Sequence, residues 1–238
     1  PAAEIQVITP AEIVRLASAI HPRYEAAIYL AAYGGLRWGE LAALRPERLD
    51  LRRGSIEVRE SLADVSGALI TQPPKSGKGR SVGLPRFLCD ILNNHLGKFS
   101  SDDYMFTSPM GEPLRRSNWY RRDFKPAVVA AGINPGFRFH DLRHTCAALA
   151  IAQGAHPKAV QERLGHASIR LTLDTYGHLM PGLDEQLRDD LDQAHFKALA
   201  ACTRPEGEKV VPFKPRKTEE PPAEQGVPVE RTTRFEPA

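Results

Sequence analysis

The sequence has few cysteines and no long hydrophobic run. Its three cysteines, Cys89, Cys146 and Cys202, do not form the even, spaced set of a disulfide framework. This pattern predicts a reducing, cytoplasmic location. No uninterrupted apolar segment is long enough to cross a bilayer, and the first residues, 1–4, have neither the basic nor the apolar region of a secretory signal. These absences argue against a secreted or membrane-spanning protein.

A strong charge of one sign is also missing. The formal net charge is +3 over 238 residues, which permits a nucleic-acid partner without requiring one. The hydrophobic fraction of 42% is sufficient for one sizeable domain with a real core, in which Cys146 is expected to be a small buried residue. The sequence starts without Met, which suggests a fragment or a processed chain.

Helix signals dominate the pattern. Thr9 and Glu12 form a capping box around Pro10, which predicts a helix that runs to about Ile20. Further helices are expected over residues 24–33, 37–44, 86–94, 118–131, 140–153, 157–164, 168–176 and 183–200. Residues 104–106 are expected to be a short extended segment.

Between the third and fourth helices the periodicity changes to alternation. Residues 56–59, 68–71 and 80–84 are predicted to form a small three-stranded antiparallel sheet, with residues 75–79 as the hairpin between the last two strands. The predicted fold class is therefore mainly α (α+β), with a multi-helix domain and a small sheet at one edge.

The composition changes again near Thr203. Residues 203–238 hold seven of the 20 prolines and as many basic as acidic residues, so they cannot bury enough apolar surface to offset their ordering entropy. We therefore predict one folded domain over residues 9–200, a short leading segment over 1–8, and a tail over 201–238 that is disordered or ordered only on a partner.

His140 and Arg143 are spaced to share one face near the start of a predicted helix. A helix N-terminus favours anions, and the guanidinium fork matches two phosphate oxygens, so the pair is suited to a phosphate. A solvated His-x-x-Arg face is the plainer alternative. His140 and His144 also have the spacing of zinc ligands, although Asp141 stands where a metalloprotease has Glu and no third ligand is evident.

Four further residues are candidates for the same chemistry. Tyr176 ends a helical stretch, where it could be mobile and exposed, and a nearby guanidinium would lower its phenol pKa from about 10. A buried aromatic is the alternative. His166 lies at a helix break, Lys75 in a turn that could close over a ligand, and Arg37 far upstream.

Taken together, these motifs resemble the catalytic domain of the tyrosine recombinases, the phage integrase family. The likeness covers about Thr9 to Leu199. It rests on five segments in the family's order, namely 34–41 around Arg37, 74–76 around Lys75, 140–145, 164–166 and 173–178 around Tyr176. The sequence begins where the linker after the family's N-terminal helical domain is expected to end, so the resemblance implies that residues 1–8 are a linker remnant and residues 9–200 the catalytic domain.

The resemblance implies a role for each residue. Tyr176 would attack a DNA phosphodiester to give a 3′-phosphotyrosyl link and a free 5′-hydroxyl. Arg37 and Arg143 would hold the non-bridging oxygens, and Lys75 would protonate the 5′ leaving oxygen. His140 would assist proton transfer from the tyrosine, and His166 would donate to a phosphate oxygen.

The resemblance further implies a site-specific DNA strand transferase, encoded by a bacterium, phage or mobile element, that uses neither a metal nor ATP nor another cofactor. Its partner would be double-stranded DNA, on which the full-length protein would act as a homotetramer, while the fragment alone could be monomeric. A type IB topoisomerase-like relaxing enzyme, a non-catalytic DNA-binding regulator and a zinc hydrolase stay open as alternatives.

Overall fold

The computed structural model of the chain describes residues 5–75, 77–99, 103–179 and 183–202. The described residues up to 179 belong to one compact unit, and the helix α10 (Leu183–Cys202) belongs to another. Each unit is considered by itself. Of the predicted tail, residues 201–202 end α10 and the remainder lies outside the described residues. Within the described part, no helix has the length and apolar character that crossing a membrane requires.

The helices of the larger unit follow the sequence pattern closely. They are α1 (Pro10–Ala19), α2 (Pro22–Gly34), α3 (Trp38–Ala42), α4 (Arg86–Phe99), α5 (Arg116–Trp119), α6 (Lys125–Ala130), α7 (Phe139–Ala152), α8 (Pro157–Leu164) and α9 (Ile169–Tyr176), with short 3₁₀ turns at Pro46–Arg48 and Gly177–Leu179. The predicted capping box is present at the start of α1, where Thr9 and Glu12 bond reciprocally. The mainly helical fold class with a small sheet is confirmed.

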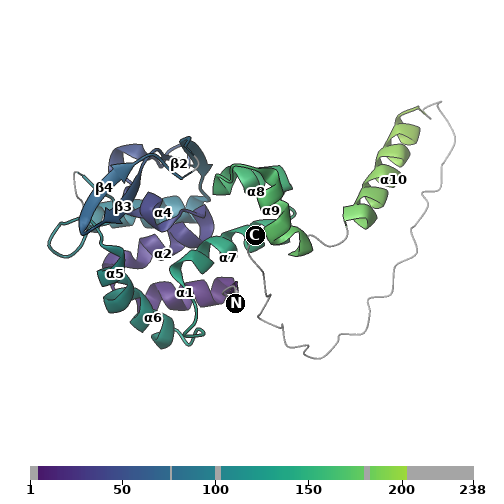
Figure 1. The fold of residues 1–238 in the computed structure, drawn as a ribbon. Coiled ribbons are helices and arrows are strands. Elements are labelled where there is room, and N and C mark those ends of the chain that lie inside the picture. Colours follow the sequence, from purple (N-terminus) through teal and green to yellow (C-terminus); the bar gives the residue numbers. More distant parts are fainter. Residues whose placement is uncertain (1–4, 76, 100–102, 180–182, 203–238) are drawn as a thin grey trace. The chain divides into compact units, whose positions relative to one another are not determined.

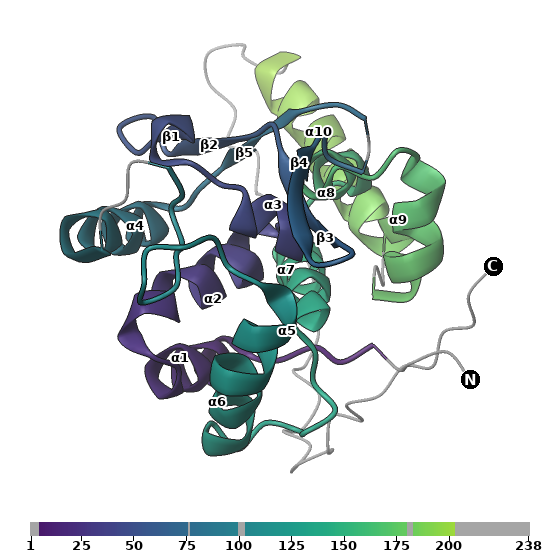
Figure 2. The ribbon, with the colours of Figure 1, turned by 60° about the vertical axis from the view of Figure 1, so that its left-hand side comes forward.

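The helix α2 is the centre of the core. It packs against α1, α4 and α7, and its Ile28 and Leu30 are fully buried. Each such side chain contributes roughly 1.5–3 kcal/mol relative to exposure. Figures 1 and 2 show the strands at one end of this unit and α1 and α6 at the other. As predicted, Cys146 is a buried residue with a free thiol.

The strand pairing differs from the prediction. A three-stranded antiparallel sheet exists, but its order is β1 (Leu49–Asp50), β2 (Ser55–Val58), β5 (Arg80–Gly83). The strand predicted at 68–71 is β4 (Ala68–Gln72), and it pairs instead with the unpredicted β3 (Ser61–Val65) in a separate two-stranded sheet. Residues 75–79 therefore join two sheets and are not a hairpin turn.

The physical reason lies in two short segments. Ser66 and Gly67 both have positive φ, 50° and 85°, as in the two-residue turns that match the twist of a hairpin. This tight turn closes β3 onto β4. On the other side of β4, Pro73 and Pro74 lack the N–H groups that a continued ladder would need, so the chain leaves the hairpin before it reaches β5.

A second difference interrupts the helix predicted over 118–131. Residues Tyr120–Phe124 form a π-helical turn between α5 and α6, and the N–H of Lys125 donates to Tyr120 five residues back. Pro126 has no N–H to give to Arg122 and its ring crowds that carbonyl, which accounts for the wider turn. Residues 104–106 contribute no named strand, and the isolated bridge nearby joins Thr107 and Pro113.

One close approach links the helices to the strands. The strand β3 packs on α3, and a Cβ on Gly39 would lie 2.4 Å from the Ser61 hydroxyl oxygen and 2.7 Å from the Leu62 carbonyl oxygen. Glycine is thus required at this contact. It places the two-stranded hairpin directly beside the helix that begins after Arg37.

Candidate active site

All six predicted site residues line a single cleft of about 370 Å³. They are Arg37, Lys75, His140, Arg143, His166 and Tyr176, and His144 lines the cleft with them. They come from the start of α3, the loop between β4 and β5, the helix α7, the turn after α8, and the end of α9. The fold therefore brings together segments that are as much as about 140 residues apart. Another hollow of about 410 Å³, mostly apolar, contains none of the six.

The Tyr176 hydroxyl meets a histidine within this cleft. His144 Nδ1 lies 2.7 Å from the Tyr176 oxygen, a normal length for a strong hydrogen bond. If the phenol donates, His144 carries its proton on Nε2, a tautomer assigned from this contact. Tyr176 is only 2% exposed, so of the two possibilities left open by the sequence, an exposed tyrosine or a buried aromatic, the structure has the buried one.

The expected lowering of the tyrosine pKa is also not found. Burial raises the pKa of Tyr176 well above its ordinary value, and this outweighs the lowering by the Arg143 charge. The guanidinium acts in the direction anticipated from the sequence, but the loss of water is the larger effect. Tyr176 is therefore a neutral phenol in the resting cleft.

His144 and His140 form a neighbouring pair on α7. Their rings meet edge to face with centroids 4.9 Å apart. Partial burial, and then repulsion from Arg143, lowers the pKa of His144 to about 4. Desolvation, then repulsion of a protonated His140 by a proton on His144 and by the Arg143 charge, lowers the pKa of His140 to about 4 as well, although His140 is an exposed residue. Both rings are neutral near pH 7 and can accept a proton.

His166 is the third neutral histidine. Its Nδ1 lies 2.9 Å from the hydroxyl of the buried Thr172, and its ring is parallel to that of Tyr176 at 6.5 Å between centroids. Burial, then the charges of Arg143 and Arg37, lower the pKa of His166 to about 3. With Nδ1 occupied by Thr172, Nε2 is the nitrogen left for a ligand.

Arg143 holds the cleft together as well as lining it. It is 2% exposed, and its two terminal nitrogens donate to the carbonyls of Gly35, after α2, and Leu164, at the end of α8. Burial, then repulsion from Arg37, lowers its pKa to about 9, so it remains charged at neutral pH. A guanidinium has five N–H donors, so others remain for an anion.

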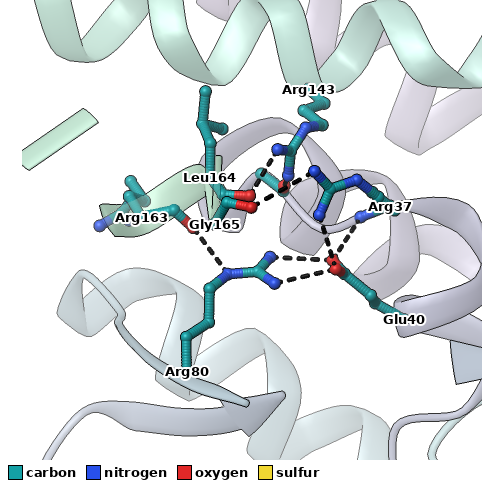
Figure 3. A network of polar contacts seen from close by, with 8 residues as sticks. Arg37, Glu40, Arg80, Arg143, Arg163, Leu164 and Gly165 are labelled. Carbon is teal, nitrogen blue, oxygen red and sulfur yellow. Dashed lines mark hydrogen bonds and ion pairs between the residues drawn. The ribbon is translucent and has the colours of Figure 1, made fainter. Parts of the chain in front are cut away.

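Arg37 belongs to a buried ionic network that Figure 3 shows from close by. The Glu40 carboxylate accepts hydrogen bonds from the Arg37 side chain at 3.0 Å and from the Arg80 side chain at 2.8 and 2.9 Å. Burial alone would raise the pKa of Glu40, but the bonds and charge of Arg80, then those of Arg37, lower it to about 2. We call Arg37, Glu40, Arg80 and Arg143 the arginine network.

Lys75 lines the same cleft but, unlike Arg143, is not buried. It is exposed, in the loop between β4 and β5. The structure thus places it in the cleft as the sequence suggested, although by a loop between sheets and not by a hairpin.

Three residues of the site were not identified from the sequence as functional. His144 was considered only as a zinc ligand, although its position next to Arg143 and four residues from His140 was a usable signal. Glu40, three residues after Arg37, matches an N-terminal capping pattern. Arg80 gave no local signal. Among the described residues, no group of three or more His, Cys, Asp or Glu side chains could hold a metal ion.

Comparison with known proteins gives a family for this arrangement. Residues 6–182 match the model of the phage integrase family. The putative prophage phiRv2 integrase of Mycobacterium tuberculosis is 33% identical over 191 residues, which cover 77% of this chain and 50% of that protein. The ICEBs1 integrase of Bacillus subtilis is 32% identical over 170 residues, 66% of this chain and 45% of that protein. The chain thus spans about half the length of these curated relatives.

The fold is shared with a solved integrase. The Tn1549 transposon integrase, determined in complex with circular intermediate DNA, superposes with a TM-score of 0.67 at 22% identity, covering 78% of this chain and 66% of that one. At this identity the likeness concerns the fold alone.

Proposed function

We propose that this chain, which belongs to the phage integrase family, cleaves and rejoins double-stranded DNA through a covalent bond between Tyr176 and a 3′-phosphate. One observation supports this most directly: the Tyr176 hydroxyl meets a histidine nitrogen in a cleft that two guanidinium groups also line. A nucleophile, a proton acceptor and fixed cations for the developing charge are the groups that phosphoryl transfer needs.

In the proposed reaction the Tyr176 oxygen attacks the phosphorus of a DNA phosphodiester. The bond from phosphorus to the 5′-oxygen breaks, its electron pair leaves with that oxygen, and Lys75 protonates the departing alkoxide. Arg37 and Arg143 bind the non-bridging oxygens, and His166 donates to one of them through Nε2. Attack by a 5′-hydroxyl of another strand reverses the step, so the phosphotyrosyl bond conserves the energy and ATP is not consumed.

We assign the phenol proton to His144, with His140 as its neighbour and not as the direct acceptor. His144 is the histidine in hydrogen-bond contact with the hydroxyl, and its low pKa leaves it unprotonated at neutral pH. Because burial keeps Tyr176 a neutral phenol, the proton should leave only as the bond to phosphorus forms. A bound phosphate would offset the arginine charges and make His144 a stronger base.

Strand exchange between two duplexes breaks a phosphodiester in each of four strands, and one Tyr176 can hold one strand. We therefore propose that the complete protein acts as a homotetramer on two DNA duplexes. The solved relative in complex with a circular intermediate DNA supports the choice of DNA as the substrate.

The test is covalent capture of DNA. The chain is incubated with a pool of nicked duplexes with a randomised central segment, because the target sequence is not known. The nick lets the short 5′-hydroxyl strand diffuse away, so the adduct accumulates. We expect a protein–DNA adduct that resists detergent for the native sequence and none for Tyr176→Phe. Tyr29→Phe, a change of the same kind on α2 outside the cleft, should leave the adduct unchanged.

The other functions give different results. An adduct with Tyr176→Phe would refute the nucleophile assignment. DNA binding without any adduct would favour a non-catalytic regulator, and relaxation of supercoiled plasmid without sequence dependence would favour a topoisomerase-like enzyme. Binding should in each case weaken steeply with salt, since phosphate contacts release counterions.

A further inference from the structure

We infer that Arg80 is a positioning residue, which occupies the Glu40 carboxylate and thereby leaves the Arg37 guanidinium available to a phosphate in the cleft. The nature of the substrate rests on the proposed function. The positioning itself rests on the contacts around Glu40, which can be followed in Figure 3.

The Glu40 carboxylate is saturated by four donors. Oε1 accepts from Arg37 Nη1 at 3.0 Å and from Arg80 Nη1 at 2.9 Å. Oε2 accepts from the Arg37 backbone N–H at 2.9 Å and from Arg80 Nη2 at 2.8 Å. An ionised carboxylate offers about four acceptor positions. With two of them taken by Arg80, only one hydrogen bond is left for the Arg37 guanidinium.

Without Arg80, the same carboxylate would have two open acceptor positions next to Arg37. A bidentate pair between guanidinium and carboxylate is the strongest geometry available to them. Since Glu40 is nearly completely buried, with 1% of its side chain exposed, water could not compete for those positions. Both terminal nitrogens of Arg37 would then bond to Glu40, and the guanidinium would no longer be available for a bidentate contact with a phosphate.

Arg80 is not placed to bind the substrate itself. Its two terminal nitrogens bond to Glu40, and its Nε donates to the Arg163 carbonyl at 3.0 Å. Its side chain is 9% exposed, and it is not among the residues that line the cleft. It therefore acts through Arg37.

The surroundings hold Arg80 in this orientation. Its guanidinium lies against Gly165, where an added Cβ would be 2.9–3.1 Å from Arg80 atoms. The same Gly165 carbonyl lies 3.4 Å from Arg37 Nη2. Arg80 thus connects β5, which follows the loop of Lys75, to the turn that carries His166.

The experiment uses thymidine 3′-(4-nitrophenyl phosphate), a small diester that needs no target sequence. Attack by Tyr176 on phosphorus releases 4-nitrophenolate, which is measured by absorbance, and leaves thymidine 3′-phosphate on the tyrosine, which is measured by mass spectrometry. The rate constant reports on positioning, and the amplitude of the adduct reports on the fraction of correctly folded chains.

Arg80→Met should lower the rate constant on the order of 10²-fold, as misplaced binding groups do, at a near-normal amplitude. Adding Glu40→Gln should restore a large part of the rate, because a neutral amide cannot capture Arg37 as an ion pair. Arg80→Lys, which keeps the charge but not the fork, should be intermediate. Arg59→Met, which removes a comparable arginine fork from Glu57 on the neighbouring exposed surface, should react normally.

Two results would overturn the inference: a native rate in Arg80→Met, or a double variant whose losses simply multiply. If the native chain forms no adduct at Tyr176, the proposed function fails instead, and orthovanadate then serves as the phosphate probe. By calorimetry, Arg80→Met should bind orthovanadate roughly tenfold more weakly, for the loss of one bidentate contact, and the double variant should recover. Equal binding by all three chains would refute the positioning role.

Discussion

Arg143 and Lys75 line the same cleft, but the fold holds them in opposite ways. Arg143 is nearly completely buried on α7 and gives its terminal nitrogens to carbonyls of two other segments. Lys75 is exposed, in a loop whose flanking strands belong to different sheets. These two cations of the cleft thus differ in burial and in the way the chain around them is held.

The difference suggests a division of work within the proposed reaction. Cations that stabilise a transition state act best when they are already oriented, because no reorganisation is then needed as charge develops. A proton donor must instead approach the leaving oxygen and withdraw from it. Burial favours the first task and exposure the second.

The largest expected effect comes from Arg143→Ala. Removal of one fixed transition-state donor lowers a rate by roughly 10²–10³-fold. The carbonyls of Gly35 and Leu164 would also lose their donor, at about 1–3 kcal/mol for each buried group. Arg143→Ala should therefore form the adduct more slowly and unfold at a lower temperature, whereas Lys75→Ala should unfold at the same temperature as the native chain. Native-like unfolding of Arg143→Ala would remove the contrast between the two cations.

Lys75→Ala tests the other side of the comparison. With a DNA strand, whose leaving group is a poor 5′-alkoxide, the rate should fall by about 10²-fold, a typical effect of losing a general acid. With thymidine 3′-(4-nitrophenyl phosphate), whose leaving group needs no proton, the rate should change less than about threefold. Equal losses with both substrates would show that Lys75 binds the phosphate and does not protonate the leaving oxygen. Lys78→Ala, in the same loop, is the matched control.

A pair of glycines compares the rigidity of the two regions. Gly165 and Gly77 have similar positive φ values, 63° and 72°, so alanine is strained by about 1–2 kcal/mol at either. Only at Gly165 does a Cβ meet Arg80 within 3.1 Å; at Gly77 nothing lies within 4 Å. Gly165→Ala should therefore lower the free energy of unfolding by more than Gly77→Ala and also slow adduct formation. Equal effects in urea unfolding would indicate that the arginine network adapts freely.

The smallest effect concerns pH. The pKa of His144 is lowered to about 4 in the folded chain, from about 6.5 when unfolded. A lowered histidine pKa contributes stability above about pH 6.5, which is lost as the pH falls towards 4, because the unfolded chain then binds the proton more readily. Between pH 7 and pH 5, the free energy of unfolding measured in urea should therefore fall by on the order of 1–2 kcal/mol less for His144→Gln than for the native chain. If the free energy of unfolding fell equally in both chains, the pKa of His144 would not be lowered by folding.

Local patterns in the sequence predicted the parts of the site that depend on local geometry. The His140–Arg143 spacing fixes two residues on one helix wherever that helix lies, and the predicted helix ends at Leu164 and Tyr176 are those of the structure. The prediction that Arg37 and Arg143 act on the same phosphate came from the family resemblance, since no local rule brings Arg37 to Arg143.

The remaining features depend on long-range pairing. Arg80 reaches Glu40 only because β5 pairs with β2, a choice that alternation in single strands does not reveal. The partner of Tyr176 is His144, which lies four residues after His140, the histidine of the His-x-x-Arg motif. Which of the two meets the tyrosine depends on where α9 packs. The direction of the tyrosine pKa shift depended on burial, which was not predictable from neighbouring charges.

The contact at Gly39 has a further consequence. The chain that follows it runs through β3, which is bonded along its length to β4, and β4 leads into the loop of Lys75. A methyl group at position 39 would displace β3 from α3. Because β4 is bonded to β3, this displacement would also shift β4 and the loop of Lys75. Under the proposed function, the distance between Arg37, which would bind the phosphate, and Lys75, which would protonate the leaving oxygen, therefore depends on residue 39 having no side chain.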